Sequence, residues 1–342
     1  MLNYLKDLCL LDGISGRENS VAGYIGKIDN LAVDTDWEGI DPIGNLIIFN
    51  KGKKTPKNKV MLSAHMDEVG FIVTYICDNG YLKFTNVGGV DSKVACGRAV
   101  SVGDNAVTGI IGQKAMHLCS DDEGSTCKEL SSLYIDIGAD SKEEAEKLVS
   151  IGDSVHFKSD YVEFGNNKIK AKAIDDRFGC AIMLKMLQQE LEYDTYFAFL
   201  VQEEVGCRGA GPAVWRVRPD YAIVLEATTA SDIAFVDDEN TVCRQGEGAV
   251  VSFMDRSTVY DMELFKGAFE IAKEREIKIQ PKTTVAGGND AGTIHKSCEG
   301  VRTIAVSLPC RYIHSGTCVA DKRDMNACYE LAKALLEEYA NA

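Results

Sequence analysis

The sequence has no paired cysteines and no long apolar run. None of its 12 cysteines forms a Cys-x-x-Cys pair, which argues against zinc knuckles. The cysteines are scattered and mostly lie in apolar contexts, which argues against a disulfide-built extracellular protein. We therefore expect reduced cysteines and a cytoplasmic protein. No apolar run approaches the ~20 residues that a membrane-spanning helix needs. Acids interrupt the apolar positions of the first 19 residues and no basic leader precedes them, so we expect no signal peptide.

The chain also lacks the basic excess that is typical of proteins that bind nucleic acids. Its 52 acidic residues outnumber 37 Lys and Arg, which gives a formal net charge of −15. Charge of this sign repels phosphates, so we expect neither nucleic acid nor an anionic membrane as a partner. A length of 342 residues is sufficient for two domains.

The pattern of apolar residues changes twice along the chain. Residues 1–29 are predicted to form two helices, and the next segments to form strands at 32–38, 45–50 and 59–64. From about 69 to 162, six short apolar runs separated by glycines predict a small β-barrel or sandwich. One helix is predicted within that segment, over Lys142–Ser150, with Ser141 as its N-cap.

Helices and strands alternate again from residue 172, as in α/β proteins. The predicted helices cover 176–190, 208–214, 261–276 and 321–340, and the predicted strands cover 195–201, 221–226 and 302–307. We therefore expect an α/β fold with a helix-flanked, mixed or mostly parallel sheet. Residues 1–68 and 163–342 would form this discontinuous catalytic domain, and residues 69–162 a small inserted β domain.

Acids and a histidine follow two of the predicted strands at the point where each ends. His65 comes directly after strand 59–64, and Asp67 can accept a hydrogen bond from its ring and fix its tautomer. Glu203 and Glu204 follow the apolar strand 195–201, where two like charges repel unless a cation compensates them. Because ligand sites of open α/β sheets collect at the carboxyl ends of strands, these positions predict one shared site.

Three further positions complete this set. Asp175 and Asp176 open the helix at 176–190, where one acid is enough for capping and the other can bridge two cations. Glu226 ends strand 221–226, and His314 follows strand 302–307. Each motif alone is also compatible with a solvated strand end or a helix cap, so the hypothesis of a metal site depends on the whole set.

The order and spacing of these motifs resemble the tetrahedral aminopeptidases, a family that includes glutamyl and leucyl aminopeptidases. The resemblance runs nearly from end to end. It is carried by Leu11-Asp12-Gly13-Ile14-Ser15-Gly16-Arg17-Glu18, Asp41-Pro42-Ile43-Gly44-Asn45-Leu46, His65-Met66-Asp67-Glu68-Val69-Gly70-Phe71, Ile174-Asp175-Asp176-Arg177, Glu203-Glu204-Val205-Gly206-Cys207-Arg208-Gly209-Ala210 and Arg311-Tyr312-Ile313-His314-Ser315.

The resemblance implies a metallo-aminopeptidase that cleaves N-terminal amino acids from peptides with a water activated by two divalent metal ions. Zinc, cobalt or manganese suits the mixed nitrogen and oxygen ligands. The implied ligands are His65 and Glu226 on one ion, Glu204 and His314 on the other, and Asp175 on both. Glu203 would act as general base and acid, and Asp67 would orient His65. Many relatives carry Asp at the position of Glu226.

The resemblance further implies a hollow tetrahedral dodecamer, assembled through the inserted domain, that admits short or unfolded peptides. The preferred N-terminal residue stays open, because acidic, aliphatic and basic preferences all occur in this family. Lys282 and Arg311 can favour an acidic side chain or can be structural.

Three other functions remain open at this stage. A deacylase of N-acyl amino acids would use a similar metal site but would not need a free α-amine. A glycoside hydrolase would use paired carboxylates, but neighbouring acids at a strand end point to different faces, which suits that chemistry poorly. An inactive peptide-binding protein would be expected to lack Glu203 or a metal ligand, and every position is filled here.

Overall fold

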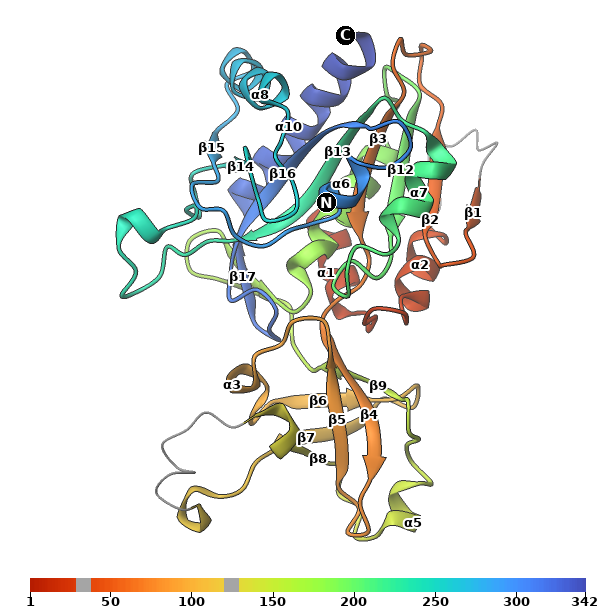
Figure 1. Cartoon of the computed structure of the whole chain (residues 1–342), viewed down its shortest axis with the longest axis vertical. Helices are drawn as coiled ribbons and strands as arrows, with labels where there is room; N and C mark the ends of the chain where they lie inside the picture. The colour runs from red at the N-terminus through yellow and green to blue at the C-terminus, as the bar shows by residue number, and fades with distance from the viewer. Residues whose placement is uncertain (29–37, 120–128) are drawn as a thin grey trace.

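The computed structural model describes residues 1–28, 38–119 and 129–342. Figure 1 shows two lobes, of which the upper contains a large mixed sheet with helices on both faces and the lower a closed β-barrel. The predicted α/β fold with a barrel-like insertion is therefore confirmed. The strand predicted over 32–38 lies outside the described residues except at its last position.

The large sheet is parallel at its centre and antiparallel towards both edges. Its main path runs β1-β2-β12-β3-β13-β16-β17-β11-β10. The central strands are β12 (Thr195–Leu200), β3 (Val60–His65), β13 (Tyr221–Thr229) and β16 (Arg302–Arg311), which pair in parallel. The remaining strands are β1 (Glu38–Ile40), β2 (Leu46–Asn50), β17 (Cys318–Asp321), β11 (Lys168–Ala171), β10 (Val162–Phe164), β14 (Ala249–Val251) and β15 (Ile279–Pro281).

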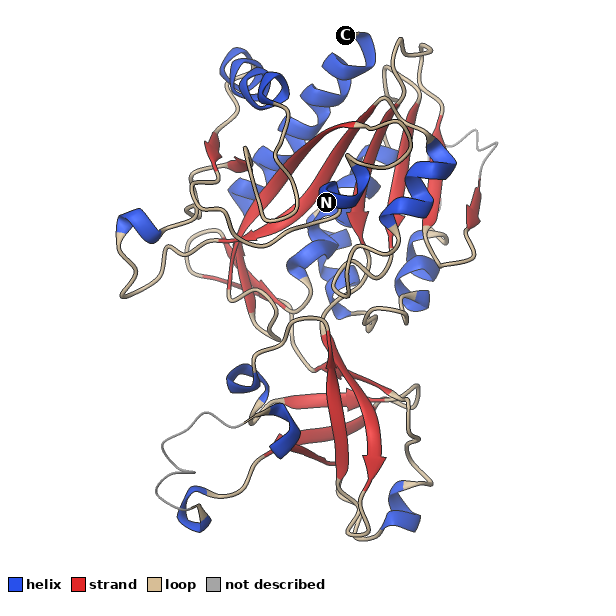
Figure 2. Cartoon of the chain, in the orientation of Figure 1, coloured by secondary structure: helices blue, strands red, loops and turns tan. Residues whose placement is uncertain are grey.

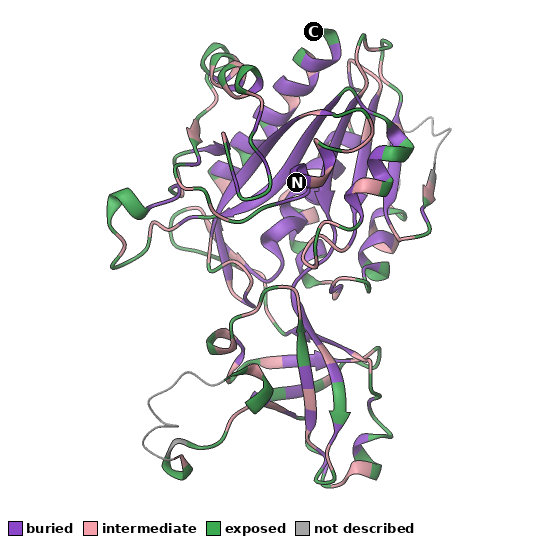
Figure 3. Ribbon diagram, viewed as in Figure 1, coloured by how far each residue is buried: buried purple, intermediate pink, exposed green. Residues whose placement is uncertain are grey.

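Helices cover both faces of this sheet (Figure 2). One apolar cluster joins it to α1 (Leu2–Leu10), α2 (Asn19–Ile25), α6 (Ile174–Leu187), α8 (Met262–Glu274) and α10 (Lys322–Asn341). A second cluster on the other face includes α7 (Ala210–Val217) and α9 (Ala291–Ile294). Neighbouring residues of β3 alternate between the clusters, since Leu62 belongs to the first and Met61 to the second. Burial on both faces explains why the central strands are continuously apolar (Figure 3).

The barrel contains all six strand-like runs that the sequence analysis identified. They form β4 (Gly70–Ile76), β5 (Leu82–Val87), β6 (Ala99–Val102), β7 (Val107–Gly112), β8 (Tyr134–Asp136) and β9 (Ser154–Phe157). Phe71 packs edge-on against Phe84 and Phe157 in the barrel core, with ring centroids 5.0 and 5.3 Å apart. The short helical segments are α3 (Ser92–Ala95), α5 (Lys142–Ala145), η1 (Met116–Leu118), η2 (Leu130–Ser132) and, in the sheet lobe, η3 (Asp238–Asn240).

The helix predicted over Lys142–Ser150 is shorter than expected. Ser141 caps α5 as predicted, by accepting the Glu144 N–H. The helix ends at Ala145, after which Lys147 and Leu148 donate to carbonyls three residues earlier. These tighter hydrogen bonds, typical of 3₁₀ turns, end the α-helical geometry. Within the described residues, no helix combines the length and apolarity that crossing a membrane requires.

A buried charge cluster joins the two lobes at Glu68, between β3 and β4. Its carboxylate accepts hydrogen bonds from the Gly13 N–H at 3.1 Å and from Lys172 Nζ at 2.6 Å. His156 of barrel strand β9 and Arg177 of α6 approach the same oxygen within 3.6 and 3.8 Å. Burial alone would raise the pKa of Glu68, but Lys172, His156 and Arg177 together lower it well below its usual range.

We predict that Glu68→Gln destabilises the protein by about 3–5 kcal/mol at neutral pH, because it removes the buried carboxylate that faces Lys172 and Arg177 and leaves Lys172 only the partly exposed Asp12 as an acidic partner. Urea unfolding followed by circular dichroism would measure the change. Because the pKa of Glu68 is lower in the folded chain, the unfolded chain takes up the proton first. The contribution is therefore complete above about pH 4.3 and is lost as the pH falls further.

The matched control is Glu190→Gln. Glu190 lies 3.3 Å from Lys53, but its side chain is 74% exposed, so its loss should change the free energy of unfolding by less than about 0.5 kcal/mol. Equal effects of the two substitutions would contradict a structural role for the Glu68 cluster. So would a difference in the free energy of unfolding between the wild type and Glu68→Gln that does not become smaller at acid pH.

Candidate metal centre

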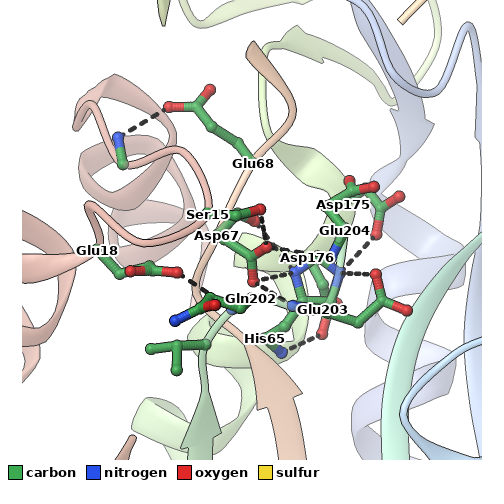
Figure 4. Close-up of polar contacts among 12 residues, drawn as sticks. Ser15, Glu18, His65, Asp67, Glu68, Asp175, Asp176, Gln202, Glu203 and Glu204 are labelled. Atoms are coloured by element: carbon green, nitrogen blue, oxygen red, sulfur yellow. Dashed lines mark hydrogen bonds and ion pairs between the residues drawn. The ribbon is translucent and has the colours of Figure 1, made fainter. Parts of the chain in front are cut away.

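Side chains from four parallel strands and one helix converge at the edge of the sheet that faces the barrel. His65 ends β3, and Glu203 and Glu204 follow β12. Asp175 lies in the first turn of α6, and Figure 4 shows these side chains pointing toward one another. The parallel strands end at the same edge of the sheet, which brings together positions that are far apart in the sequence. Glu226 on β13 and His314 after β16 complete the group.

Asp175 lies between the two histidines. Its Oδ1 is 3.3 Å from His65 Nε2, and its Oδ2 is 3.6 Å from His314 Nε2. Each histidine has a second carboxylate beside the same nitrogen: Glu226 Oε1 lies 3.6 Å from His65, and Glu204 Oε2 lies 3.3 Å from His314. The arrangement is thus two His–carboxylate pairs with one shared carboxylate.

The opposite ring nitrogens face carbonyl groups. His65 Nδ1 lies 3.0 Å from the Asp67 carbonyl oxygen, and His314 Nδ1 lies 3.0 Å from the carbonyl oxygen of Gly89. A neutral ring that donates from Nδ1 presents a lone pair at Nε2. That lone pair would face carboxylate oxygens, so each pair requires a proton or a cation between its members. Gly89 belongs to the barrel lobe, so both lobes hold His314.

The Asp67 carboxylate mainly holds the backbone of the two glutamates. It accepts the N–H groups of Glu203 at 3.0 Å and Glu204 at 3.1 Å, and the Ser15 hydroxyl at 2.6 Å. It lies 3.5 Å from His65 Nδ1, farther than the Asp67 carbonyl. Sequence reasoning predicted only the contact with the ring. The structure adds a second effect, which is to fix the turn after β12.

Charge is crowded in this group. Burial and the Asp175 charge raise the pKa values of Glu204 and Glu226 well above their usual range, and burial also raises the pKa of Glu203. Burial would raise the pKa of Asp175 as well, but the two histidines lower it below its usual range. The carboxylates therefore cannot all be ionised without added positive charge.

The residues present fit divalent metal ions. Glu226 Oε2 is buried and has no hydrogen-bond partner among the described residues. The other oxygen of this carboxylate, Oε1, lies 3.6 Å from His65 Nε2, so the unpaired Oε2 is available to a cation bound at this end of the strand. Mixed imidazole and carboxylate donors suit zinc, cobalt and manganese. A second group, Asp12, Glu68 and His156, is already neutralised by Lys172 and Arg177.

Two buried acids near the centre have surroundings that sequence reasoning did not predict in full. Asp176 accepts the backbone N–H groups of His65 and Gly179, each at 3.2 Å, and so ties the end of β3 to α6. Asp290 is fully buried with Oδ1 unpaired, and burial together with the Glu203 charge raises its pKa well above the usual range. The two glycines at 287–288, before Asn289 and Asp290, are the signal that could have indicated this segment.

A cavity of about 350 Å³ opens at the centre. Four of the candidate acids and His314 line one part of it, and the remainder is lined by Thr228, Thr229, Val242, Lys282, Gly288 and Ile313, among others. A larger groove of about 500 Å³, lined by α10 and the segment that follows α8, contains none of the site residues. The cavity at the metal centre is therefore the candidate substrate site.

Comparisons with known proteins agree with this geometry. A family model described as M42 glutamyl aminopeptidase matches residues 44–331. The lysyl aminopeptidase of Pyrococcus furiosus is 33% identical over 350 residues, covering 98% of this chain and 96% of that protein.

Two solved structures are also similar. Aminopeptidase APDkam598 of the archaeon Desulfurococcus kamchatkensis is 34% identical, with a TM-score of 0.91 over 98% of this chain and 94% of that one. The TET1 peptidase of Pyrococcus horikoshii, described as assembling into a tetrahedron or a large octahedral shell, is 32% identical, with a TM-score of 0.84 over 98% of both chains.

We predict that His65→Ala and His314→Ala each weaken the binding of divalent metal by on the order of 100-fold or more, because each removes a neutral nitrogen donor from a carboxylate-rich pair. Metal content per chain after extensive dialysis, measured by mass spectrometry, would report the loss. His117→Ala is the control, since His117 is exposed in η1 of the barrel lobe. Full metal occupancy in either site variant would remove that histidine from the set of ligands.

Proposed function

The chain belongs to the M42 glutamyl aminopeptidase family, and from that membership we propose how its metal centre and its barrel serve the removal of N-terminal amino acids. As a member it is a metallo-aminopeptidase, a hydrolase that acts on the first peptide bond of a peptide. The ligand set, the number of ions, the assembly and the cellular location described below are our proposals.

We propose that each chain holds two divalent ions. His65 and Glu226 would bind one, Glu204 and His314 the other, and Asp175 both. The observation that carries this proposal is the position of Asp175, with one carboxylate oxygen directed at each histidine. A single-ion site would need a proton on the other histidine to compensate the two carboxylates that its nitrogen faces. Zinc, cobalt and manganese are the candidate ions.

The bound ions would lower the pKa of water and polarise the scissile carbonyl. Glu203 is the proposed general base and acid. Its Oε2 lies 4.0 Å from His65 Nε2, and its side chain lines the cavity. Burial raises its pKa, which brings a carboxylate closer to the neutral range in which a base can both accept and return a proton. Glu203 would take the proton of the attacking water and deliver it to the leaving amine.

Two neighbours hold Glu203 for this task. Its backbone N–H is fixed by Asp67 at 3.0 Å, and the Cys207 thiol donates to its Oε1 at 3.4 Å. Its Oε2 is left for the substrate side of the cavity. The many acids that line this cavity also favour the positively charged α-amine of a peptide N-terminus. Blocked substrates lack this charge, so the deacylase and glycosidase alternatives are not favoured.

We propose that residues 1–68 and 163–342 form the catalytic domain, and that residues 69–162 form an inserted domain that mediates assembly. The TET1 peptidase, similar over 98% of both chains, supports a homo-oligomer with closed symmetry, and we propose a tetrahedral dodecamer. A hollow assembly of this kind would admit short or unfolded peptides. The 11 described cysteines are all free, which supports a cytoplasmic location.

The metal-loaded protein should hydrolyse aminoacyl 4-nitroanilides that carry a free α-amine and should leave their N-acetylated counterparts intact. Activity should disappear with a chelator and return with zinc, cobalt or manganese, because the carboxylate cluster needs its counter-charge. Hydrolysis of the acetylated compounds would instead identify a deacylase, and turnover that survives chelation would exclude the proposed chemistry.

The substitution Glu203→Gln tests whether Glu203 acts as the general base and not as a metal ligand. Turnover should fall by at least about 1000-fold because the proton acceptor is lost, whereas the metal content should stay unchanged. Glu204→Gln is the matched variant at the neighbouring position, and it should lower both the metal content and the turnover. Comparable metal loss in the two variants would contradict this division of roles.

Replacement of residues 69–162 by a short linker should convert the assembly into a smaller species, as measured by sedimentation velocity. Apolar side chains of this segment, such as Phe71 and Phe157, pack with one another in a separate core, so the sheet lobe keeps its own core. A large particle of unchanged size would refute the role of the barrel in assembly.

A further inference from the structure

One buried cation shares the substrate cavity with the metal centre. Lys282 follows β15, and only 7% of its surface is exposed. Among the described residues that line the cavity, it is the one lysine or arginine. Fully buried lysines without an ionic partner are rare, because transfer of an ammonium group from water is costly. The position of this cation therefore needs a reason.

The backbone holds Lys282 firmly at this place. Its N–H donates to the Val251 carbonyl at 2.9 Å, and the next residue, Thr283, is bound through its hydroxyl and its N–H to the Val242 carbonyl. Val251 belongs to β14, which pairs with β16 of the large sheet. The lysine is thus anchored to the sheet, and its position relative to the metal centre does not depend on a free loop.

The ammonium group keeps unused hydrogen-bonding capacity. Lys282 Nζ donates to the Ala286 carbonyl at 2.7 Å. It forms no ion pair with an acid of the described chain, although Asp255 and Glu226 are near enough to raise its pKa against the larger lowering by burial. An ammonium group has three donors, so the ligand that enters the cavity can satisfy those that remain.

Arg311, the other cation considered from the sequence, is already paired. Its Nε and a terminal nitrogen donate to the two carboxylate oxygens of Asp232, at 2.8 and 2.7 Å. Arg311 does not line the cavity. A bidentate pair of this kind leaves little attraction for a second carboxylate. Of the two candidates, only Lys282 is free to meet a substrate.

We infer that Lys282 selects peptides whose N-terminal residue is acidic, by donating hydrogen bonds to the side-chain carboxylate of that residue. The inference rests on the proposed aminopeptidase function, which places the N-terminal residue in this cavity. Outside the metal centre the cavity is lined by uncharged residues such as Thr228, Thr229, Val242 and Gly288, which leave Lys282 as the cation available to the substrate side chain. A lysyl or arginyl side chain would meet a like charge and would be rejected.

The test compares kcat/KM for the glutamyl, aspartyl, glutaminyl, leucyl and lysyl 4-nitroanilides with the metal-loaded protein. Glutamyl and glutaminyl compounds have the same shape and differ in charge, so their ratio measures the contribution of a cation. We expect the wild-type protein to prefer glutamyl over glutaminyl by about 30-fold or more, the effect of a buried charged hydrogen bond.

Lys282→Met should remove this preference. Its kcat/KM for glutamyl and aspartyl compounds should fall by about 30-fold or more, while the value for the leucyl compound should change by less than about threefold. Lys282→Arg should retain part of the preference. Lys278→Met is the matched control, because Lys278 lies four residues earlier, is 58% exposed and pairs with Glu247 at 2.9 Å. It should leave every value unchanged.

The measurements distinguish a failure of the proposed role of Lys282 from a failure of the proposed aminopeptidase function. A wild-type protein that hydrolyses leucyl or lysyl compounds as well as glutamyl ones would overturn the role of Lys282 and leave the aminopeptidase in place. A uniform loss over all substrates in Lys282→Met, or a loss of bound metal, would show that the lysine only balances the charge of the site. If no free-amine compound is hydrolysed, the proposed function itself fails, and the inference fails with it. The wild-type glutamyl-to-glutaminyl ratio decides the question even if the variant does not fold.

Discussion

The crowding of carboxylates around Asp175 is the constraint on which the rest of the structure depends. Glu203, Glu204 and Glu226 share one buried edge of the sheet with Asp175, and burial raises the pKa values of these three glutamates. A protein without cations would not gain stability from this arrangement. Bound cations would offset the same repulsion. Asp175 lies between the two histidines, with one carboxylate oxygen near each.

Much of the surrounding structure keeps these acids in place. Asp67 fixes the backbone of Glu203 and Glu204, and Asp176 ties His65 to α6. Preorganisation of this kind matters because ligands that already point inwards lose little conformational freedom when an ion binds. The acids that accept backbone N–H groups are therefore as important to the centre as those that face the cavity.

The two lobes are coupled through polar contacts at their junction. Glu68 connects the loop after α1, the start of α6 and barrel strand β9, and the Gly89 carbonyl of the barrel lobe faces His314. A change in the position of the barrel would therefore change the surroundings of a candidate ligand. This gives a physical link between the lobe that we propose for assembly and the lobe that carries the chemistry.

The sequence by itself determined the central strands, the main helices and the chemical character of the site, but it did not indicate the short strands β14, β15 and β17. Apolar runs such as residues 59–64 and 195–201 located the central strands because burial on both faces leaves few polar positions. The acids and histidines at the strand ends indicated a metal site because parallel strands end at one edge. Local pattern was less reliable for the helix after Ser141, where 3₁₀ hydrogen bonds end the helix early.

Only the tertiary structure decided which partner each of these side chains has. Asp67 follows His65 in the sequence, yet its carboxylate binds the backbone of Glu203 and Glu204. Lys282 and Arg311 were equivalent candidates in the sequence. The fold gives Arg311 the carboxylate of Asp232 and leaves Lys282 in the cavity with one carbonyl. For Asp290 the local signal was limited to the two glycines before Asn289, because its burial close to the Glu203 charge arises from segments far apart in the chain. Charge pairing is a property of distance in space, which the order of residues does not contain.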